Sequence, residues 1–131
     1  MCPLSLSSLL VTARHITSIL ILTMALDKTH AALAVLPQPT PYHLHQYPAS
    51  APLPSWTGST SDFLSITRTP HELSIVYAGD SRQEDNAEEY DGPWRALRVA
   101  GPMELTMTGV LHALTGPLKE ASVPIFALST W

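Results

Sequence analysis

The fold is decided by a stretch near the C-terminus that begins Trp94-Arg95-Ala96-Leu97-Arg98-Val99 and continues Ala100-Gly101-Pro102. Its first six residues predict a strand, and Gly101-Pro102 predicts a turn. From Met103 onward, apolar residues recur every three or four positions, which predicts a helix with one buried face. The residues of that face are Met107, Val110, Leu111, Leu114 and Leu118.

A second strand follows the helix. We expect Gly116-Pro117 to kink or nearly break the helix, because proline lacks the backbone donor and clashes with the preceding turn. Residues 124–130 predict a buried strand. A strand–helix–strand unit requires a right-handed crossover onto one face of a sheet, so the two strands are expected to be parallel.

Toward the N-terminus, residues 31–77 alternate strand-like runs with proline-rich turns. We expect strands over 32–36, 42–47, 63–67 and 73–77. Thr69-Pro70-His71-Glu72 has the pattern of a capping box and predicts a single helical turn. Residues 78–92 hold six acidic residues against one arginine and predict a solvated linker.

Composition excludes several classes of protein. Of the 131 residues, 45% are hydrophobic and 14% are charged, so disorder of the whole chain is not expected. The net charge is −4 and no lysine or arginine cluster occurs, which argues against binding to nucleic acid. A single cysteine, Cys2, excludes an internal disulfide framework and a multi-thiolate metal site.

The first 26 residues are apolar and are interrupted by Arg14 and His15. We expect them to be a leader or a gene-model extension outside the fold, with Met24 as a natural start. A targeting segment and a membrane span remain alternatives. Arg14 would lie near the middle of a span, where a charge is costly, so no membrane association is expected. A cytoplasmic location is expected, and it depends on whether these residues are expressed.

The residues quoted above resemble the ACT domain family, in the subfamily of small tandem ACT proteins that includes the cytosolic arginine sensor. Upstream, residues 63–76 and Leu36-Pro37 followed by Tyr42 resemble the first unit of the same subfamily. The resemblance covers about residues 31–131, with its pieces in family order. It is carried most clearly by Thr108-Gly109-Val110-Leu111, Gly116-Pro117-Leu118 and Ile125-Phe126-Ala127-Leu128-Ser129-Thr130.

The resemblance implies an α+β, ferredoxin-like ACT fold, in which helices cover one face of an antiparallel sheet. It implies a degenerate first ACT-like unit over 31–77, an acidic linker over 78–92 and a second ACT-like unit over 93–131. In relatives, the Ser-Thr-aromatic strand continues through an aspartate-containing turn into another strand and a helix. Here the sequence stops at Trp131, so we expect the second unit to be truncated at its C-terminus.

ACT domains bind a small molecule, often an amino acid, at an interface between units, and binding then alters a partner. The resemblance therefore implies a non-catalytic regulatory module that senses an amino acid, without a cofactor. Its expected partner is another copy of the chain or a regulated protein. The alternative is an interaction-only scaffold without a ligand. No nucleophile elbow and no phosphate-binding glycine loop occur, so an enzyme is not expected.

The candidate ligand site centres on Gly101, where the strand gives way to the helix. The amides of Met103, Glu104 and Leu105 are expected to be free donors at a helix N-terminus, which suits a carboxylate. Glu104 is the nearest acid for the ammonium group of the ligand. The alternative is that Gly101-Pro102 is only a turn.

The first unit is expected to complete the site with the backbone of Ser74, Ile75 and Val76. By resemblance, Ser129 and Thr130 close its far side. A metal site is an alternative role for the histidines. His43 and His45 share a strand face and could act with His30, but no acid or thiolate lies nearby. We therefore expect a solvent-facing histidine pair and no metal.

Overall fold

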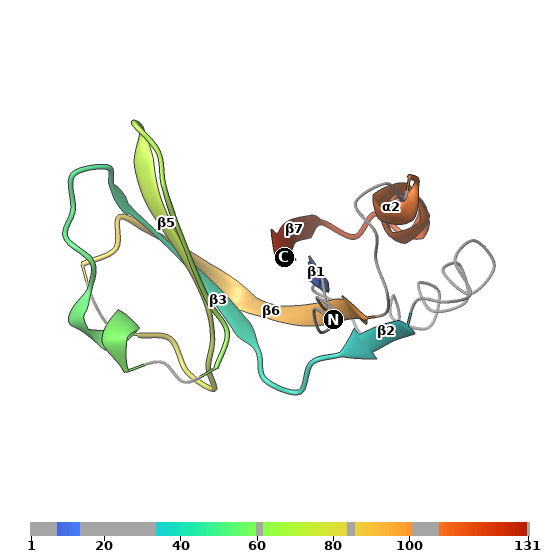
Figure 1. The fold of residues 1–131 in the computed structure, drawn as a ribbon, viewed down its shortest axis with the longest axis horizontal. Coiled ribbons are helices and arrows are strands. Elements are labelled where there is room, and N and C mark those ends of the chain that lie inside the picture. The colour runs from blue at the N-terminus through green and yellow to red at the C-terminus, as the bar shows by residue number, and fades with distance from the viewer. Residues whose placement is uncertain (1–7, 14–33, 60–61, 84–85, 101–107, 131) are drawn as a thin grey trace, which may run out of the picture. The chain divides into compact units, whose positions relative to one another are not determined.

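The computed structural model describes residues 8–13, 34–59, 62–83, 86–100 and 108–130 (Figure 1). The chain forms two compact units. Unit 1 joins Met1–Pro39 to Arg95–Trp131, and unit 2 is Thr40–Trp94. Strand β6 (Glu89–Ala100) begins in unit 2 and ends in unit 1. The fold is α+β, as the sequence predicts.

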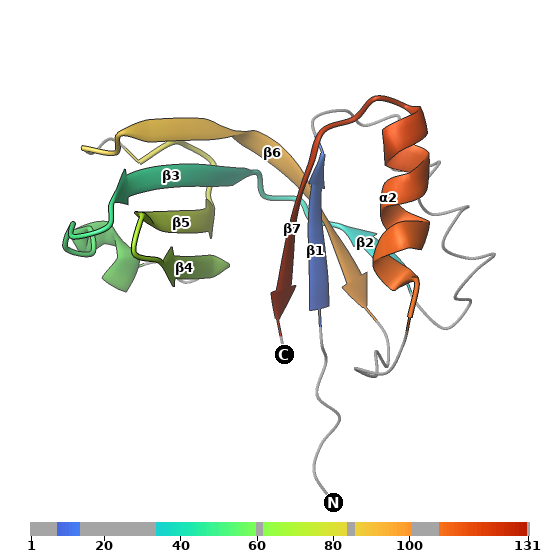
Figure 2. The ribbon, with the colours of Figure 1, turned by 90° about the horizontal axis from the view of Figure 1, so that it is seen from above.

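The described part of unit 1 is an antiparallel sheet with one helix. Strand β1 (Ser8–Ala13) lies between β6 and β7 (Ile125–Thr130), and β2 (Ala34–Pro37) pairs with β6. The order is therefore β2-β6-β1-β7, which is the order of a ferredoxin-like sheet. Since β6 and β7 are both antiparallel to β1, they are parallel to each other, which confirms the predicted parallel relation. Helix α2 (Val110–Glu120) covers one face of this sheet (Figure 2).

Helix α2 follows Gly109, whose φ of 80° lies in the left-handed region that favours glycine. Its buried residues are Val110, Leu114 and Leu118, spaced four apart. Leu111 was expected on this face but is 48% exposed, because it lies one position outside that four-residue spacing. The helix also continues through Gly116-Pro117, where a kink or near break was expected, so the near break does not occur. Burial of Leu114 and Leu118 on either side offsets the backbone hydrogen bond that Pro117 cannot donate.

Strand β7 was expected to be buried, and the structure corrects this. Ile125 is 37% exposed, and the strand alternates exposed with half-buried residues through Ser129. Among the described strands, β7 pairs with β1 alone. An edge position explains the exposure.

The strands of unit 2 run in the order β4-β5-β3-β6 and are antiparallel. They comprise β3 (Tyr42–Pro48), β4 (Leu64–Arg68), β5 (Glu72–Ala78) and the first part of β6. The strands predicted from the alternating pattern are confirmed, with bounds shifted by about one residue. A short 3-10 helix, η1 (Ser55–Gly58), follows β3.

The helical turn expected at Thr69-Pro70-His71-Glu72 is a tight hairpin turn between β4 and β5. Thr69 nevertheless makes the hydrogen bonds of a capping residue. Its Oγ1 accepts from the backbone N–H groups of His71 and Glu72, both at 3.1 Å. A threonine hydroxyl makes the same local bonds in a hairpin turn as at a helix start.

Two short segments that the sequence placed outside the ACT-like units are strands in the structure. Ser8–Ala13, expected outside the fold, forms β1 with partners on both sides. Residues 89–92, expected in the linker, are the first residues of β6. Val11 in one segment and Tyr90 in the other are residue types that favour strands. The boundaries of the two ACT-like units stay a prediction.

Candidate functional site

Four of the predicted ligand residues, Gly101, Met103, Glu104 and Leu105, lie outside the described residues. The other five lie on strands. Ser74, Ile75 and Val76 belong to β5 in unit 2, and Ser129 and Thr130 belong to β7 in unit 1. Each group is therefore held by regular structure within its own unit.

Strand β5 is an interior strand, paired with β3 on one side and β4 on the other. Its backbone groups are therefore taken up by two ladders. Ile75 and Val76 are buried, with exposures of 0% and 4%. Ser74 is half-buried, and its Oγ donates to Glu72 Oε1 at 2.7 Å. Of these three residues, Ser74 presents the most accessible polar group.

Strand β7 places Ser129 opposite Leu9 and Thr130 opposite Ser8 of β1. Ser129 is exposed. Because β7 is an edge strand among those described, its outer backbone groups are candidates for pairing with a ligand or another chain.

The histidine pair is buried, which corrects the expectation that it faces solvent. His43 and His45 are 3% and 2% exposed. They do share one face of β3, as the alternation predicts, and Tyr47 is the next residue on that face. Residue His30 lies outside the described part of the chain. What we call the histidine cluster consists of five residues of unit 2: His43, His45, Tyr47, Tyr77 and Tyr90.

The hydrogen bonds of His43 indicate which of its two ring nitrogens carries the proton. Its Nε2 lies 3.0 Å from the carbonyl oxygen of Gly79, which can only accept, so Nε2 carries the proton. Its Nδ1 lies 2.9 Å from the hydroxyl of Tyr90, which therefore donates to it when the ring is neutral. Both ring nitrogens are satisfied without water, as a buried imidazole requires.

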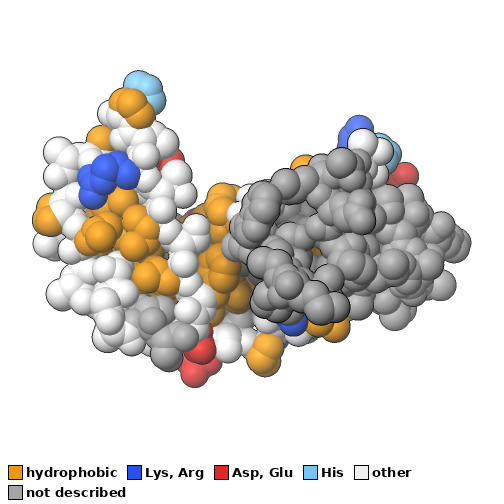
Figure 3. All heavy atoms as spheres, viewed as in Figure 1, with side chains coloured by type: hydrophobic (Ala, Val, Ile, Leu, Met, Phe, Trp, Pro, Cys, Tyr) orange, Lys and Arg blue, Asp and Glu red, His pale blue; other side chains and the backbone are white. Residues whose placement is uncertain are grey.

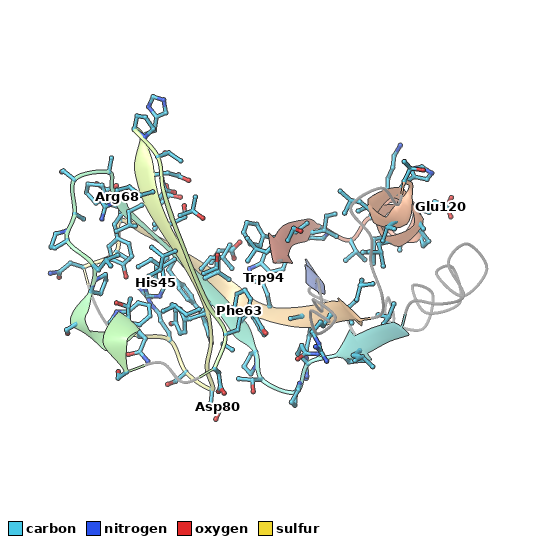
Figure 4. The ribbon with its side chains drawn as sticks, viewed as in Figure 1. His45, Phe63, Arg68, Asp80, Trp94 and Glu120 are labelled. Carbon is cyan, nitrogen blue, oxygen red and sulfur yellow. The ribbon has the colours of Figure 1, made fainter. Side chains whose placement is uncertain are left out.

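His45 lies among the rings of unit 2 (Figure 4). Its Nδ1 is 3.0 Å from the Tyr47 hydroxyl, and its Nε2 is 3.4 Å from the Tyr77 hydroxyl. The Tyr77 hydroxyl also accepts a hydrogen bond of 2.7 Å from the backbone N–H of Gln83. Trp56 of η1 covers the cluster, with its ring centroid 4.8 Å from that of Tyr77.

Gly92 closes the cluster from β6. A Cβ at this position would lie 3.0 Å from the Tyr90 hydroxyl and 3.1 Å from His43 Nδ1. Its φ of 152° is also one that residues with a side chain rarely adopt. Since His43 and His45 are buried and each of their ring nitrogens has a hydrogen-bond partner, we interpret the cluster as a polar core rather than a catalytic centre.

A concave site lies in unit 1, beside α2 and the residues that lead into β7. This site, which we call the helix pocket, has a volume of about 440 Å³. One wall comes from α2 and the other from Val123, Pro124 and Ile125. The α2 residues are His112, Thr115, Gly116 and Lys119. The sequence did not predict this pocket. Its only sign there is the helical spacing of three polar residues, His112, Thr115 and Lys119.

Within the residues that the structure describes, no three histidine, cysteine, aspartate or glutamate side chains gather as metal ligands. In the same residues, no helix has both the length and the apolar character needed to cross a membrane.

Two family models match this chain. The ACT domain matches residues 89–131, which contain β6, α2 and β7. A model described as an N-terminal domain matches residues 42–84, which lie in unit 2. No curated protein and no solved structure matches the chain significantly. The first match supports an ACT-type relationship for the C-terminal third, and ACT domains are in general regulatory, ligand-binding and non-catalytic.

Proposed function

We propose that this chain is a non-catalytic regulatory module that binds an amino acid at an interface between ACT units. The observation that supports it best is the ACT match over β6, α2 and β7. The parallel arrangement of β6 and β7 around β1, with α2 on one face, agrees with that match.

We place the carboxylate of the ligand at the amides of Met103, Glu104 and Leu105, after Gly101, and its ammonium group near Glu104. This part of the proposal rests on the sequence and on the affinity of helix N-termini for anions. From unit 2 we expect a contribution from the Ser74 hydroxyl more than from the backbone of Ile75 or Val76, because β5 is an interior strand. Ser129 and Thr130 are the proposed contacts from β7.

The second candidate function is an interaction-only scaffold without a ligand. The exposed residues of β7, an edge strand among those described, favour it, because edge strands can pair with another chain. In either function the expected partner is a second copy or a regulated protein. A cytoplasmic location stays a prediction.

Calorimetry of the full chain against each of the twenty amino acids separates the two functions. The sensor predicts saturable heat for one or a few amino acids, whereas the scaffold predicts none. Gly101→Val should abolish that heat, because its side chain would occupy the space where the ligand approaches the backbone.

Gly58→Val is the matched control, since Gly58 is exposed and nothing lies within 4 Å of a Cβ there. It should bind as the wild type does. Undiminished binding by Gly101→Val would reject the proposed site, and absence of heat with every amino acid would reject the sensor.

A further inference from the structure

The helix pocket is built from residues of unit 1 alone. Its four α2 residues follow the spacing i, i+3, i+4 and i+7, so they share one face of the helix. This face is separate from the buried one formed by Val110, Leu114 and Leu118. Its volume of about 440 Å³ lies within the range of small-molecule sites.

Gly116 gives the first indication that this space has a role. Glycine in the interior of a helix is less stable than alanine, so it is normally retained for a tight contact or an unusual backbone angle. Gly116 precedes Pro117, whose ring crowds a preceding Cβ in the helical conformation; beyond its chain neighbours and its own helix, nothing lies within 4 Å of a Cβ at Gly116. Its missing side chain leaves the wall of the pocket open.

The charge of the lining gives the second indication. The lining residues include His112, Thr115 and the exposed Lys119, and none of the lining residues is acidic. The acidic Glu120 projects from the end of α2 and is not a lining residue (Figure 4). Figure 3 shows basic, histidine and acidic side chains gathered over α2. The described lining therefore favours an anion.

The opposite wall is apolar. Val123 is 9% exposed, Ile125 is 37% exposed, and Pro124 lies between them. A partly exposed isoleucine beside a cation suits a ligand that has both an apolar body and one negative group. An ammonium group on the same ligand would face Lys119 without a carboxylate to pair with it.

We propose that the helix pocket is a second binding site, distinct from the amino-acid site, that takes a small organic carboxylate with an apolar body and no amino group. The carboxylate contacts Lys119, with Thr115 and His112 as hydrogen-bond partners. The apolar body lies against Val123, Pro124 and Ile125, over Gly116.

Titration of the ¹⁵N-labelled full chain by NMR tests this, with 4-methylpentanoate as the probe. Saturable shifts are expected at the amides of Gly116, Lys119 and Val123. The neutral analogue 4-methylpentanamide and the zwitterion leucine should produce these shifts at least tenfold more weakly, since the first lacks the charge and the second adds an ammonium group. Equal responses to all three, or no saturable shift at these amides, would overturn the proposal.

Two variants locate the site. Gly116→Leu places a side chain in the open space and should abolish the shifts, while circular dichroism stays that of the wild type. Lys119→Gln should weaken 4-methylpentanoate about tenfold. Lys119 also lies in the last turn, where a cation stabilises a helix, so affinity rather than stability is the decisive measurement.

Glu120→Gln is the control, because it changes the neighbouring charge outside the lining and should leave binding within about twofold of the wild type. If Gly116→Leu loses helical signal, Gly116→Ala replaces it and should weaken binding while the helix is retained. Wild-type affinity in Lys119→Gln and in a folded Gly116 variant would reject the site.

Discussion

The two units differ in the kinds of side chain that they bury. The buried residues of unit 1 that the structure describes are aliphatic, such as Leu97, Val99, Leu114 and Leu118. Unit 2 buries two histidines among tyrosines, joined by hydrogen bonds, beside aliphatic residues such as Leu73 and Ile75. An aliphatic core loses stability in proportion to the space that a substitution empties. A polar core loses it whenever one bond is left unmade, even if the shape is kept.

The largest effect is expected in unit 1, for Leu114→Ala. Leu114 is 0% exposed at the centre of the buried face of α2, so truncation should cost about 2–5 kcal/mol of unfolding free energy. Leu111→Ala, on the same helix but 48% exposed, should change it by only about 0.5 kcal/mol. Urea denaturation followed by circular dichroism measures both. Similar losses in the two variants would contradict the assignment of the buried face.

The next largest effect is expected for Gly92→Ala. This substitution tests unit 2 by adding a methyl group instead of removing side-chain atoms. A Cβ there meets Tyr90 and His43 at 3.0 and 3.1 Å, and the φ of 152° is unfavourable for alanine. Together these should cost about 1–3 kcal/mol. Gly58→Ala, in open space, is the control and should be nearly neutral. If Gly92→Ala leaves the free energy of unfolding unchanged, the histidine cluster is packed less tightly than its contacts indicate.

Tyr90→Phe isolates one hydrogen bond of the cluster. It retains the ring, over which the Arg82 guanidinium lies 4.3 Å from the centroid, and removes only the hydroxyl that donates to His43 Nδ1. Leaving that buried nitrogen without its donor should cost about 1–2 kcal/mol. Arg82→Gln, which removes the exposed cation and leaves the bond, should cost about 0.5–1 kcal/mol. If Arg82→Gln proves the more damaging of the two, the polar-core interpretation fails.

Imidazole ¹⁵N spectra of the wild type check the same bond directly. His43 should have a protonated Nε2 and an unprotonated Nδ1, because Gly79 offers only an acceptor. The opposite tautomer would show that the donor to Nδ1 is not the Tyr90 hydroxyl.

The sequence predicted local pattern well. Alternation located β3 and β4, a β-rich run located β5, and helical spacing located α2 and most of its buried face. The parallel relation of β6 and β7 followed from the helix that connects them across one sheet. These properties depend on neighbouring residues or on rules that hold for most sheets.

What the sequence could not supply depends on distant contacts. Alternation put His43 and His45 on one face but could not tell that Trp56, from a later segment, covers it. Thr69 makes the same hydroxyl bonds in a hairpin turn as at a helix start, so its pattern did not distinguish them. The helix pocket depends on a residue without a side chain and on the segment after the helix, so no motif marked it. Of the predicted ligand residues, four lie outside the described residues and five lie on strands.

The smallest effect on stability is expected for a second glycine, Gly116, which can be compared directly with Gly92. Gly116→Ala adds the same methyl group as Gly92→Ala, but into open space and at an ordinary helical angle. It should therefore be nearly neutral, within about 0.5 kcal/mol, because the gain from a more restricted unfolded chain is offset by crowding of the new Cβ against the Pro117 ring. Thermal unfolding of the two variants side by side measures the contrast. A loss as large as that of Gly92→Ala would mean that the space beside α2 is filled by other parts of the chain, and the helix pocket would then lose its main support.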